Sequence, residues 1–253
     1  MRRAEAIALG LLQGPAELLP ISSSAHVGLA LDRLGVAGAE RKEFEVALHA
    51  GTAVALALLD RRPLRWGLLI AATAPPALAG LAFERPIEER LGTPRSIAAG
   101  LLAGAAAMVL ADRMPVRRGE TGARDGGAPP RREPDAVDGA WLGAAQALAL
   151  IPGVSRSGAT RAAARLRGFD REAAAELSRA VALPVLAGAT ALKGARLIAR
   201  RPGRESMARL ALGAAAAVVS TAMTLRLRES GLKRWAAYRA ALAVVIVWQD
   251  RDR

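Results

Sequence analysis

The chain has 253 residues, of which 52% are hydrophobic and 3% aromatic, and it carries a formal net charge of +13 and no cysteine. The lack of cysteine excludes a disulfide framework and thiol chemistry, and the scarcity of β-branched and aromatic runs excludes a protein built mainly of strands. A charge this positive is typical of nucleic-acid binding. Here, however, the arginines lie between apolar segments, which suits anionic lipid headgroups, and we expect no nucleic-acid partner. The apolar positions are mainly Ala, Leu, Val and Gly, which favour close helix packing in lipid. We therefore predict an all-α polytopic membrane protein.

Two short apolar runs, residues 6–16 and 18–31, open the chain, and a Pro and three Ser interrupt the second. Neither run reaches the about 20 residues that cross a hydrocarbon core. They predict a re-entrant pair, meaning a helix, a non-helical loop and a helix that returns to the same side. Three predicted membrane-spanning helices follow, at residues 41–60, 66–83 and 96–111. Pro75-Pro76 predicts a kink in the second of them.

Residues 113–138 are rich in Arg, Gly, Pro and Asp without periodicity, which predicts a flexible linker. The earlier pattern then returns as a second interrupted helix pair over residues 139–168. Three further spans are predicted at residues 172–192, 210–225 and 235–248. We predict a single membrane domain over residues 1–253, with a first repeat at 1–112, the linker at 113–138 and a second repeat at 139–253.

Each half thus combines a re-entrant pair with three spans. Because three is an odd number of crossings, the second half enters from the opposite side, which predicts an inverted repeat with a site near the membrane midplane. A short internal match at an offset of 133 residues agrees, pairing Gly10-x-x-Gln13 and Ser22-x-Ser24 with Gly143-x-x-Gln146 and Ser155-x-Ser157. Lysines and arginines are evenly divided between the two sides, so the positive-inside rule gives no orientation.

The first polar segment, QGPAELLPISSSAH at residues 13–26, contains two ionisable groups in an apolar setting. Such groups cost at least a few kcal/mol at membrane depth and are usually functional. Taken alone, Glu17 also fits an interfacial charge and His26 a satisfied buried imidazole. Their place on either side of a Pro-Ile-Ser-Ser-Ser loop favours an anion site built from backbone N–H groups, hydroxyls and a helix N-terminus. Ser24 also fits the N-cap of the helix that carries His26.

The second polar segment, PGVSRSGAT at residues 152–160, also combines a helix-breaking loop with hydroxyl side chains, and it adds a cationic side chain. Gly153 permits a tight turn, and Arg156 supplies a planar fork that matches phosphate. A solvated arginine in a helix connection is the alternative, which the apolar flanks oppose. We expect the two loops to meet in the membrane and form one diphosphate site.

An acid, an imidazole, hydroxyls and an arginine around one anion indicate phosphoryl transfer, often with a divalent metal. We expect Glu17 to bind Mg²⁺ or Ca²⁺, and we expect His26 to act as general acid or base, because imidazole is the side chain that ordinarily exchanges a proton near neutral pH. The sequence contains neither GxxxxGK[ST] nor HExxH, so it supports neither nucleotide-driven nor zincin chemistry.

On these two motifs the sequence resembles the undecaprenyl-diphosphate phosphatase family, the bacitracin-resistance type of integral membrane phosphatase. Supporting segments are Phe44-Glu45-Val46, ELSRAVALPVLAGAT at residues 176–190 and Tyr238-Arg239. The resemblance implies removal of the terminal phosphate of undecaprenyl diphosphate, which yields the lipid carrier of cell-wall (peptidoglycan) synthesis. It also implies bacitracin resistance, a divalent cation, re-entrant pairs in an inverted repeat and a multi-pass location in the bacterial cell membrane.

By motif position, the resemblance implies that Glu17 positions the metal with Gln13 beside it. The serine-histidine loop places Ser23 or a water as the nucleophile and His26 as its proton partner, although a histidine nucleophile also stays open. Arg156 would hold the diphosphate. The further predicted binding residues are Ser22, Ser24, Gly153, Ser155, Ser157 and Thr160.

The sequence departs from the family pattern at a few positions. Ala16 and Ala25 stand where the family usually has Thr and Gly, and Arg179 stands where it is normally apolar. Gln13 is not an anionic ligand, so a metal depends on Glu17. None of these changes removes a core group, and an active enzyme is expected.

Two other functions fit the same residues. A prenyl-phosphate transporter or flippase would bind the lipid without releasing phosphate, and inverted repeats are frequent among transporters. A basic membrane-associated structural protein would tolerate loss of Ser23, His26 and Arg156. The preferred metal, the prenyl chain length and the oligomeric state stay open, with a homodimer among the options.

Overall fold

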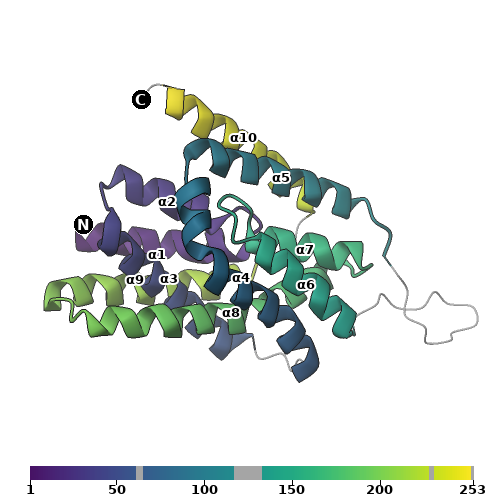
Figure 1. The fold of residues 1–253 in the computed structure, drawn as a ribbon, viewed down its shortest axis with the longest axis horizontal. Helices are drawn as coiled ribbons and strands as arrows, with labels where there is room; N and C mark the ends of the chain where they lie inside the picture. The colour runs from purple at the N-terminus through teal and green to yellow at the C-terminus, as the bar shows by residue number, and fades with distance from the viewer. Residues whose placement is uncertain (61–64, 117–132, 228–230, 252–253) are drawn as a thin grey trace, which may run out of the picture. The chain divides into compact units, whose positions relative to one another are not determined.

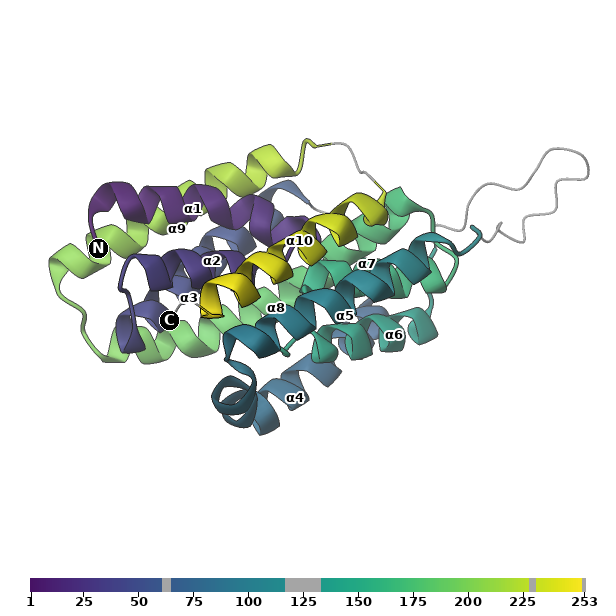
Figure 2. The ribbon, with the colours of Figure 1, turned by 90° about the horizontal axis from the view of Figure 1, so that it is seen from above.

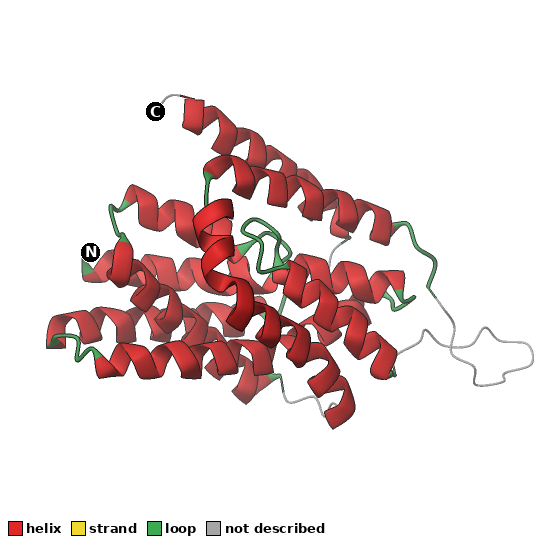
Figure 3. Cartoon of the chain, viewed as in Figure 1, coloured by secondary structure: helices red, strands yellow, loops and turns green. Residues whose placement is uncertain are grey.

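The computed structural model describes residues 1–60, 65–116, 133–227 and 231–251, and over these residues the chain is helical without a strand (Figure 3). Ten helices cover the described residues (Figure 1): α1 Arg3–Leu18, α2 Ser23–Arg33, α3 Gly38–Leu59, α4 Trp66–Leu91, α5 Pro94–Asp112, α6 Ala136–Leu148, α7 Arg156–Leu166, α8 Arg171–Ala199, α9 Arg204–Thr224 and α10 Leu232–Arg251. The all-α prediction is confirmed.

The helices repeat in the predicted order, with two shorter helices followed by three longer ones in each half. Helices α1, α2 and α3 begin at residues 3, 23 and 38, and α6, α7 and α8 begin at 136, 156 and 171, so each pair of starts is 133 residues apart. This spacing equals the offset of the short sequence match. The match therefore reflects a repeat of the helix layout, while the inversion of the second copy stays a prediction.

Four helices among the described residues are long and apolar enough to cross a membrane, at Trp66–Phe83, Pro94–Asp112, Arg171–Ala199 and Arg204–Thr224. Their surfaces carry large exposed apolar side chains, such as Trp66 at 80% and Leu81 at 74% exposure on α4. Large exposed apolar side chains in this number on long apolar helices indicate contact with another apolar phase. The chain is thus a membrane protein. The other two predicted spans fall on α3 and α10, which are 22 and 20 residues long.

Helix α4 runs without interruption through Pro75 and Pro76 and extends eight residues past the predicted end of the span at Phe83. It changes direction along its length in both ribbon views (Figures 1 and 2). Each proline removes one backbone donor and its ring crowds the preceding turn, which bends a helix without ending it. Part of the predicted linker, residues 117–132, lies outside the described residues. Helix α6 already begins at Ala136, within the predicted linker range.

The chain divides into two compact units. The first holds α1, α2, α3, α9 and α8 from Ala182 onward. The second holds residues 20–22, α4 to α7, α8 up to Val181, and α10. In each unit the first helix of one repeat packs against the fourth helix of the other, α1 against α9 and α6 against α4. Neither unit therefore coincides with a sequence repeat.

Glycines matched by the repeat allow these two pairings. A Cβ on Gly10 of α1 would lie 2.3 Å from the carbonyl oxygen of Gly213, and one on Gly143 of α6 would lie 2.5 Å from that of Ala71. In the first unit the Ser220 hydroxyl of α9 completes the contact, because it donates to the Gly10 carbonyl (2.8 Å) and accepts from the Gly14 amide (3.1 Å). Close approach through small residues with polar cross-links is typical of helices in lipid.

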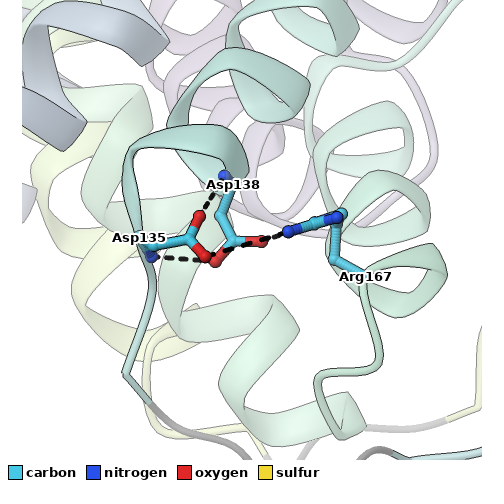
Figure 4. A network of polar contacts seen from close by, with 3 residues as sticks. All are labelled: Asp135, Asp138 and Arg167. Carbon is cyan, nitrogen blue, oxygen red and sulfur yellow. Dashed lines mark hydrogen bonds and ion pairs between the residues drawn. The ribbon is translucent and has the colours of Figure 1, made fainter.

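In the second unit, polar contacts join the start of α6 to the end of α7. Asp135 and Asp138 form a reciprocal cap at the start of α6, each carboxylate accepting from the other's backbone N–H at 2.8 Å. Arg167, just after α7, donates from Nε to Asp138 Oδ1 at 2.7 Å (Figure 4). The start of α6 thus lies beside the end of α7, so the two helices form a hairpin. Re-entry of this hairpin into the membrane stays a prediction.

Candidate active site

Helix α1 carries the acidic part of the first motif. Gln13 and Glu17 are four residues apart and therefore on one face of the helix, and their exposed fractions are only 1% and 5%. The Gln13 amide Nε2 lies 3.4 Å from Glu17 Oε2. Burial of an ionisable carboxyl group is costly, which favours a functional role for Glu17.

Helix α3 places a second group against this acid. His49 Nε2 lies 3.5 Å from the same Glu17 Oε2 atom. Sequence reasoning did not assign His49 to the site. The signal was nevertheless present, because His49 is one of only two histidines and lies in an apolar segment.

The loop between α1 and α2 has a strained backbone. Ser22 has φ 78° and is buried, a conformation that side chains with a Cβ rarely adopt. Such outliers concentrate at functional sites. Helix α2 begins at Ser23, so Ser24 is exposed within its first turn and does not precede the helix as a cap.

Ser23 and His26 are both half-buried and are three residues apart on α2. That spacing puts them on one face of the helix. The predicted nucleophile and its predicted proton partner therefore share a face, and this face belongs to the helix that follows the strained loop.

The residues around Glu17 are compatible with a divalent cation only if the substrate shares in binding it. The described residues contain no group of three or more His, Cys, Asp or Glu side chains that would hold a metal by themselves. Mg²⁺, however, is commonly bound by one or two carboxylates together with waters and substrate phosphates. Glu17 with the Gln13 amide oxygen meets that requirement, provided that the substrate supplies the remaining oxygen ligands.

The loop before α7 is built on a glycine turn and a serine cap. Gly153 has φ 88°, which a residue with a Cβ adopts only under strain. Ser155 is the N-cap of α7, and its Oγ accepts from the Gly158 amide at 3.2 Å. The Ser155 and Ser157 hydroxyls lie 3.2 Å apart, and both side chains are buried.

Arg156 is the first residue of α7, at the end where a helix attracts anions. Its Nη1 donates to the carbonyl of Ser178 on α8 at 3.2 Å, which orients the half-buried side chain. The Thr160 hydroxyl donates to the Arg156 carbonyl at 2.9 Å and lies 2.7 Å from the Ser178 hydroxyl. Thr160 thus supports the backbone of Arg156, and its predicted contact with diphosphate stays a prediction.

Sequence reasoning also missed two supports of this loop. Ser178 lies in the segment at residues 176–190 but gave no local signal that separated it from other small residues. Arg239 did give one, because it is an ionisable residue inside an apolar run, and its guanidinium donates to the carbonyl of Gly153 at 2.9 Å.

The structure therefore groups the predicted residues into two sets. Gln13, Glu17, Ser23 and His26 belong to the first unit, whereas the loop at residues 152–160 belongs to the second. The predicted meeting of the two loops stays a prediction.

This combination of residues defines a class, a helical membrane protein with a buried Gln–Glu pair and a serine-capped, arginine-bearing helix N-terminus suited to a phosphate group. Comparison with known proteins places it more narrowly. Residues 6–245 match the family model described as bacitracin resistance protein BacA, and the chain belongs to that family.

Three relatives named undecaprenyl-diphosphatase align over nearly the whole chain. The one from Geobacter sulfurreducens is 39% identical and covers 92% of this chain and 91% of its own length. Those from Geobacter metallireducens and Moorella thermoacetica are 33% and 34% identical and cover 94% and 98% of this chain, and 93% and 98% of their own lengths.

Proposed function

We propose that this protein is an enzyme that hydrolyses undecaprenyl diphosphate to undecaprenyl phosphate and inorganic phosphate. The observation that carries the proposal is the first turn of α7, where Arg156 and buried serine hydroxyls surround a capped helix N-terminus. A phosphate group matches this arrangement through charge and through hydrogen-bond donors. The names of the relatives support the same reaction and favour hydrolysis over the transport alternative.

In the proposed mechanism, Arg156 and the amides at the start of α7 bind the diphosphate and offset its charge. The oxygen of a water or of Ser23 attacks the terminal phosphorus, and His26 accepts the proton of that nucleophile. The bond between the terminal phosphorus and the bridging oxygen breaks, and undecaprenyl phosphate leaves. If Ser23 attacks, a water then releases its phosphoryl group as inorganic phosphate.

Glu17 and Gln13 are the residues that would hold a divalent cation, Mg²⁺ or Ca²⁺. A bound cation would neutralise charge that develops on the phosphoryl oxygens. The burial of Glu17 supports this role, because a cation offsets the cost of an ionised carboxylate in an apolar setting.

The same proposal sets the protein in the bacterial cell membrane as a multi-pass protein with an inverted repeat. It is directly testable because the chain has no cysteine. Single cysteines at Trp66 and at Arg204, near the starts of the two matched helices α4 and α9, should react with a membrane-impermeant maleimide from opposite sides. Labelling of both positions from one side would contradict the inversion.

Phosphate release is the test of the reaction. Purified protein in detergent with Mg²⁺ should release inorganic phosphate from undecaprenyl or farnesyl diphosphate. Arg156→Ala and Glu17→Ala should each lower the rate by about 100-fold or more, the usual effect of removing a group that stabilises transition-state charge.

The matched control is Arg95→Ala, because that arginine is on the exposed surface, 3.3 Å from Asp250. It should retain the wild-type rate. If the wild-type protein binds the lipid but releases no phosphate, the enzymatic function is refuted and the transporter function is the alternative that fits.

A further inference from the structure

The second unit contains a fully buried arginine that the proposed mechanism does not use. Arg239 of α10 has an exposed fraction of 0% and is the largest fully buried side chain among the described residues. Its Nη2 donates to the carbonyl oxygens of Gly153 (2.9 Å) and Gly100 (3.3 Å). Its Nε and Nη1 have no hydrogen-bond partner among the described residues. A guanidinium held this deeply with neutral partners is expensive, and the cost requires a reason.

Missing side chains on two neighbouring helices make room for the guanidinium. A Cβ on Gly104 of α5 would lie 2.2 Å from Nη2, 2.8 Å from Cζ and 3.0 Å from Nη1. A Cβ on Gly158, in the first turn of α7, would lie 2.8 Å from Nη1. The head group of Arg239 therefore lies between α5 and the first turn of α7. Helices α5 and α10 run side by side in both ribbon views (Figures 1 and 2).

The turn that Arg239 contacts rests directly on α5. A Cβ on Gly153 would lie 2.1 Å from the carbonyl oxygen of Ile97, and one on Gly100 would lie 2.3 Å from that of Pro152. The two carbonyl oxygens that accept from Arg239 thus come from the two sides of this contact, Gly100 from α5 and Gly153 from the turn. One nitrogen of the side chain joins the turn to the helix beneath it.

We propose that Arg239 is a positioning residue for the diphosphate-binding loop. It fixes the Gly153 turn on α5 and so sets the first turn of α7, which carries Arg156 three residues later. Its charge also lies against the N-terminal end of α7, where a cation is unfavourable alone and an anion is favourable. Binding of a diphosphate at that end would offset the cost of the buried charge. The inference deepens the proposed function and rests on it.

A nearby arginine provides a matched control. Arg165, at the other end of α7, is also buried and also bonds two backbone carbonyls, those of Phe169 (2.6 Å) and Met114 (2.5 Å). It resembles Arg239 in charge, in burial and in its bonds to backbone carbonyls, but it also has Asp112 and Asp170 nearby and lies at the end of α7 remote from the loop. Arg239→Met and Arg165→Met should both lower the thermal unfolding temperature.

The two variants should differ in substrate affinity. Loss of a charge-assisted hydrogen bond is worth about 1.5–3 kcal/mol, so Arg239→Met should raise KM for farnesyl diphosphate, and Kd for inorganic pyrophosphate with Mg²⁺, by about tenfold or more. Arg165→Met should change both by less than about twofold. Arg239→Lys, which retains the charge and a donor, should recover part of the affinity and serves as the probe if the methionine variant does not fold.

A double-mutant cycle tests the contact itself. Gly104→Ala should weaken pyrophosphate binding in the wild-type background, because its methyl group meets the guanidinium. In the Arg239→Met background the same change should have little further effect. Pyrophosphate affinity that is unchanged in Arg239→Met, with only a lower unfolding temperature as in Arg165→Met, would overturn the inference. Pyrophosphate binding can be measured without turnover. A wild-type protein that binds pyrophosphate without releasing phosphate from the lipid would therefore refute the proposed hydrolysis, while the affinities of Arg239→Met and Arg165→Met could still be compared.

Discussion

The two interrupted helix pairs share a layout and differ in chemistry. Both interrupt the helix with one residue in the left-handed region, Ser22 with φ 78° before α2 and Gly153 with φ 88° before α7. The first pair carries the buried acid Glu17, with His49 beside it, whereas the second carries Arg156 on a serine-capped helix. A duplicated backbone thus supports two opposite charges. In the proposed mechanism the roles are divided accordingly, with metal and proton chemistry in the first pair and phosphate binding in the second.

The largest expected effect is the loss of stability when a methyl group is added to the glycine turn of the second loop. Gly153→Ala imposes a left-handed conformation on a residue with a Cβ and places that Cβ 2.1 Å from the Ile97 carbonyl oxygen. Strain of this kind costs about 1–3 kcal/mol before the collision is counted. We expect a loss at the upper end of that range or above it, measured as the free energy of unfolding in mixed micelles.

The control for this change is Gly188→Ala, at a site on α8 where an added Cβ meets nothing within 4 Å. It should be neutral or slightly stabilising, because alanine favours helix. A Gly153→Ala protein as stable and as active as the control would show that the tight turn is dispensable.

Activity should depend on His49, the neighbour of Glu17, more than folding does. His49→Ala removes the group 3.5 Å from Glu17 Oε2, and loss of a side chain that orients a metal ligand typically costs about 10- to 100-fold in metal affinity or activity. We expect phosphate release to fall by about tenfold and the Mg²⁺ concentration for half-maximal rate to rise. His49→Gln keeps a donor near the carboxylate and should lose less. Equal rates in all three proteins would place His49 outside the site.

The strain at Ser22 should be measurable separately from its hydroxyl. Ser22→Gly removes both the hydroxyl and the Cβ, whereas Ser22→Ala removes the hydroxyl and keeps the strained Cβ. A left-handed conformation costs about 1–2 kcal/mol for a residue with a Cβ, so the glycine variant should be more stable than the alanine variant by about that amount. Equal unfolding free energies of the two variants would contradict a left-handed Ser22.

The smallest effect concerns the support of α1. Ser220→Ala removes the hydroxyl that joins the Gly10 carbonyl and the Gly14 amide, and a buried group that loses its partner costs about 1–3 kcal/mol. Thr224→Val removes a hydroxyl that bonds the Ser220 carbonyl within its own helix at 2.7 Å. We expect a larger drop in unfolding temperature for Ser220→Ala. The reverse order would argue against the cross-helix bridge.

The sequence was sufficient to predict the helical class, the order of the elements and the two motifs. The lengths of the apolar runs and the helix breakers Pro20 and Gly153 are signals that can be seen locally in the sequence. The helix starts repeat at the same offset as the short sequence match. The sequence was not sufficient to predict that α1 packs against α9 and α6 against α4, because pairing of distant helices depends on which small residues face each other. For the same reason His49, Ser178 and Arg239 were missed, since their roles come from neighbours that are remote in sequence.

The division of roles has one direct test, the initial rate of phosphate release from farnesyl diphosphate over a grid of substrate and Mg²⁺ concentrations. The conservative variants Glu17→Asp and Arg156→Lys should retain enough activity to be compared with wild type. The account predicts that Glu17→Asp raises mainly the Mg²⁺ requirement and Arg156→Lys raises mainly KM for the diphosphate. The account would be contradicted if the wild-type protein released no phosphate. It would also be contradicted if both variants changed the Mg²⁺ requirement and the KM for the diphosphate by the same factors.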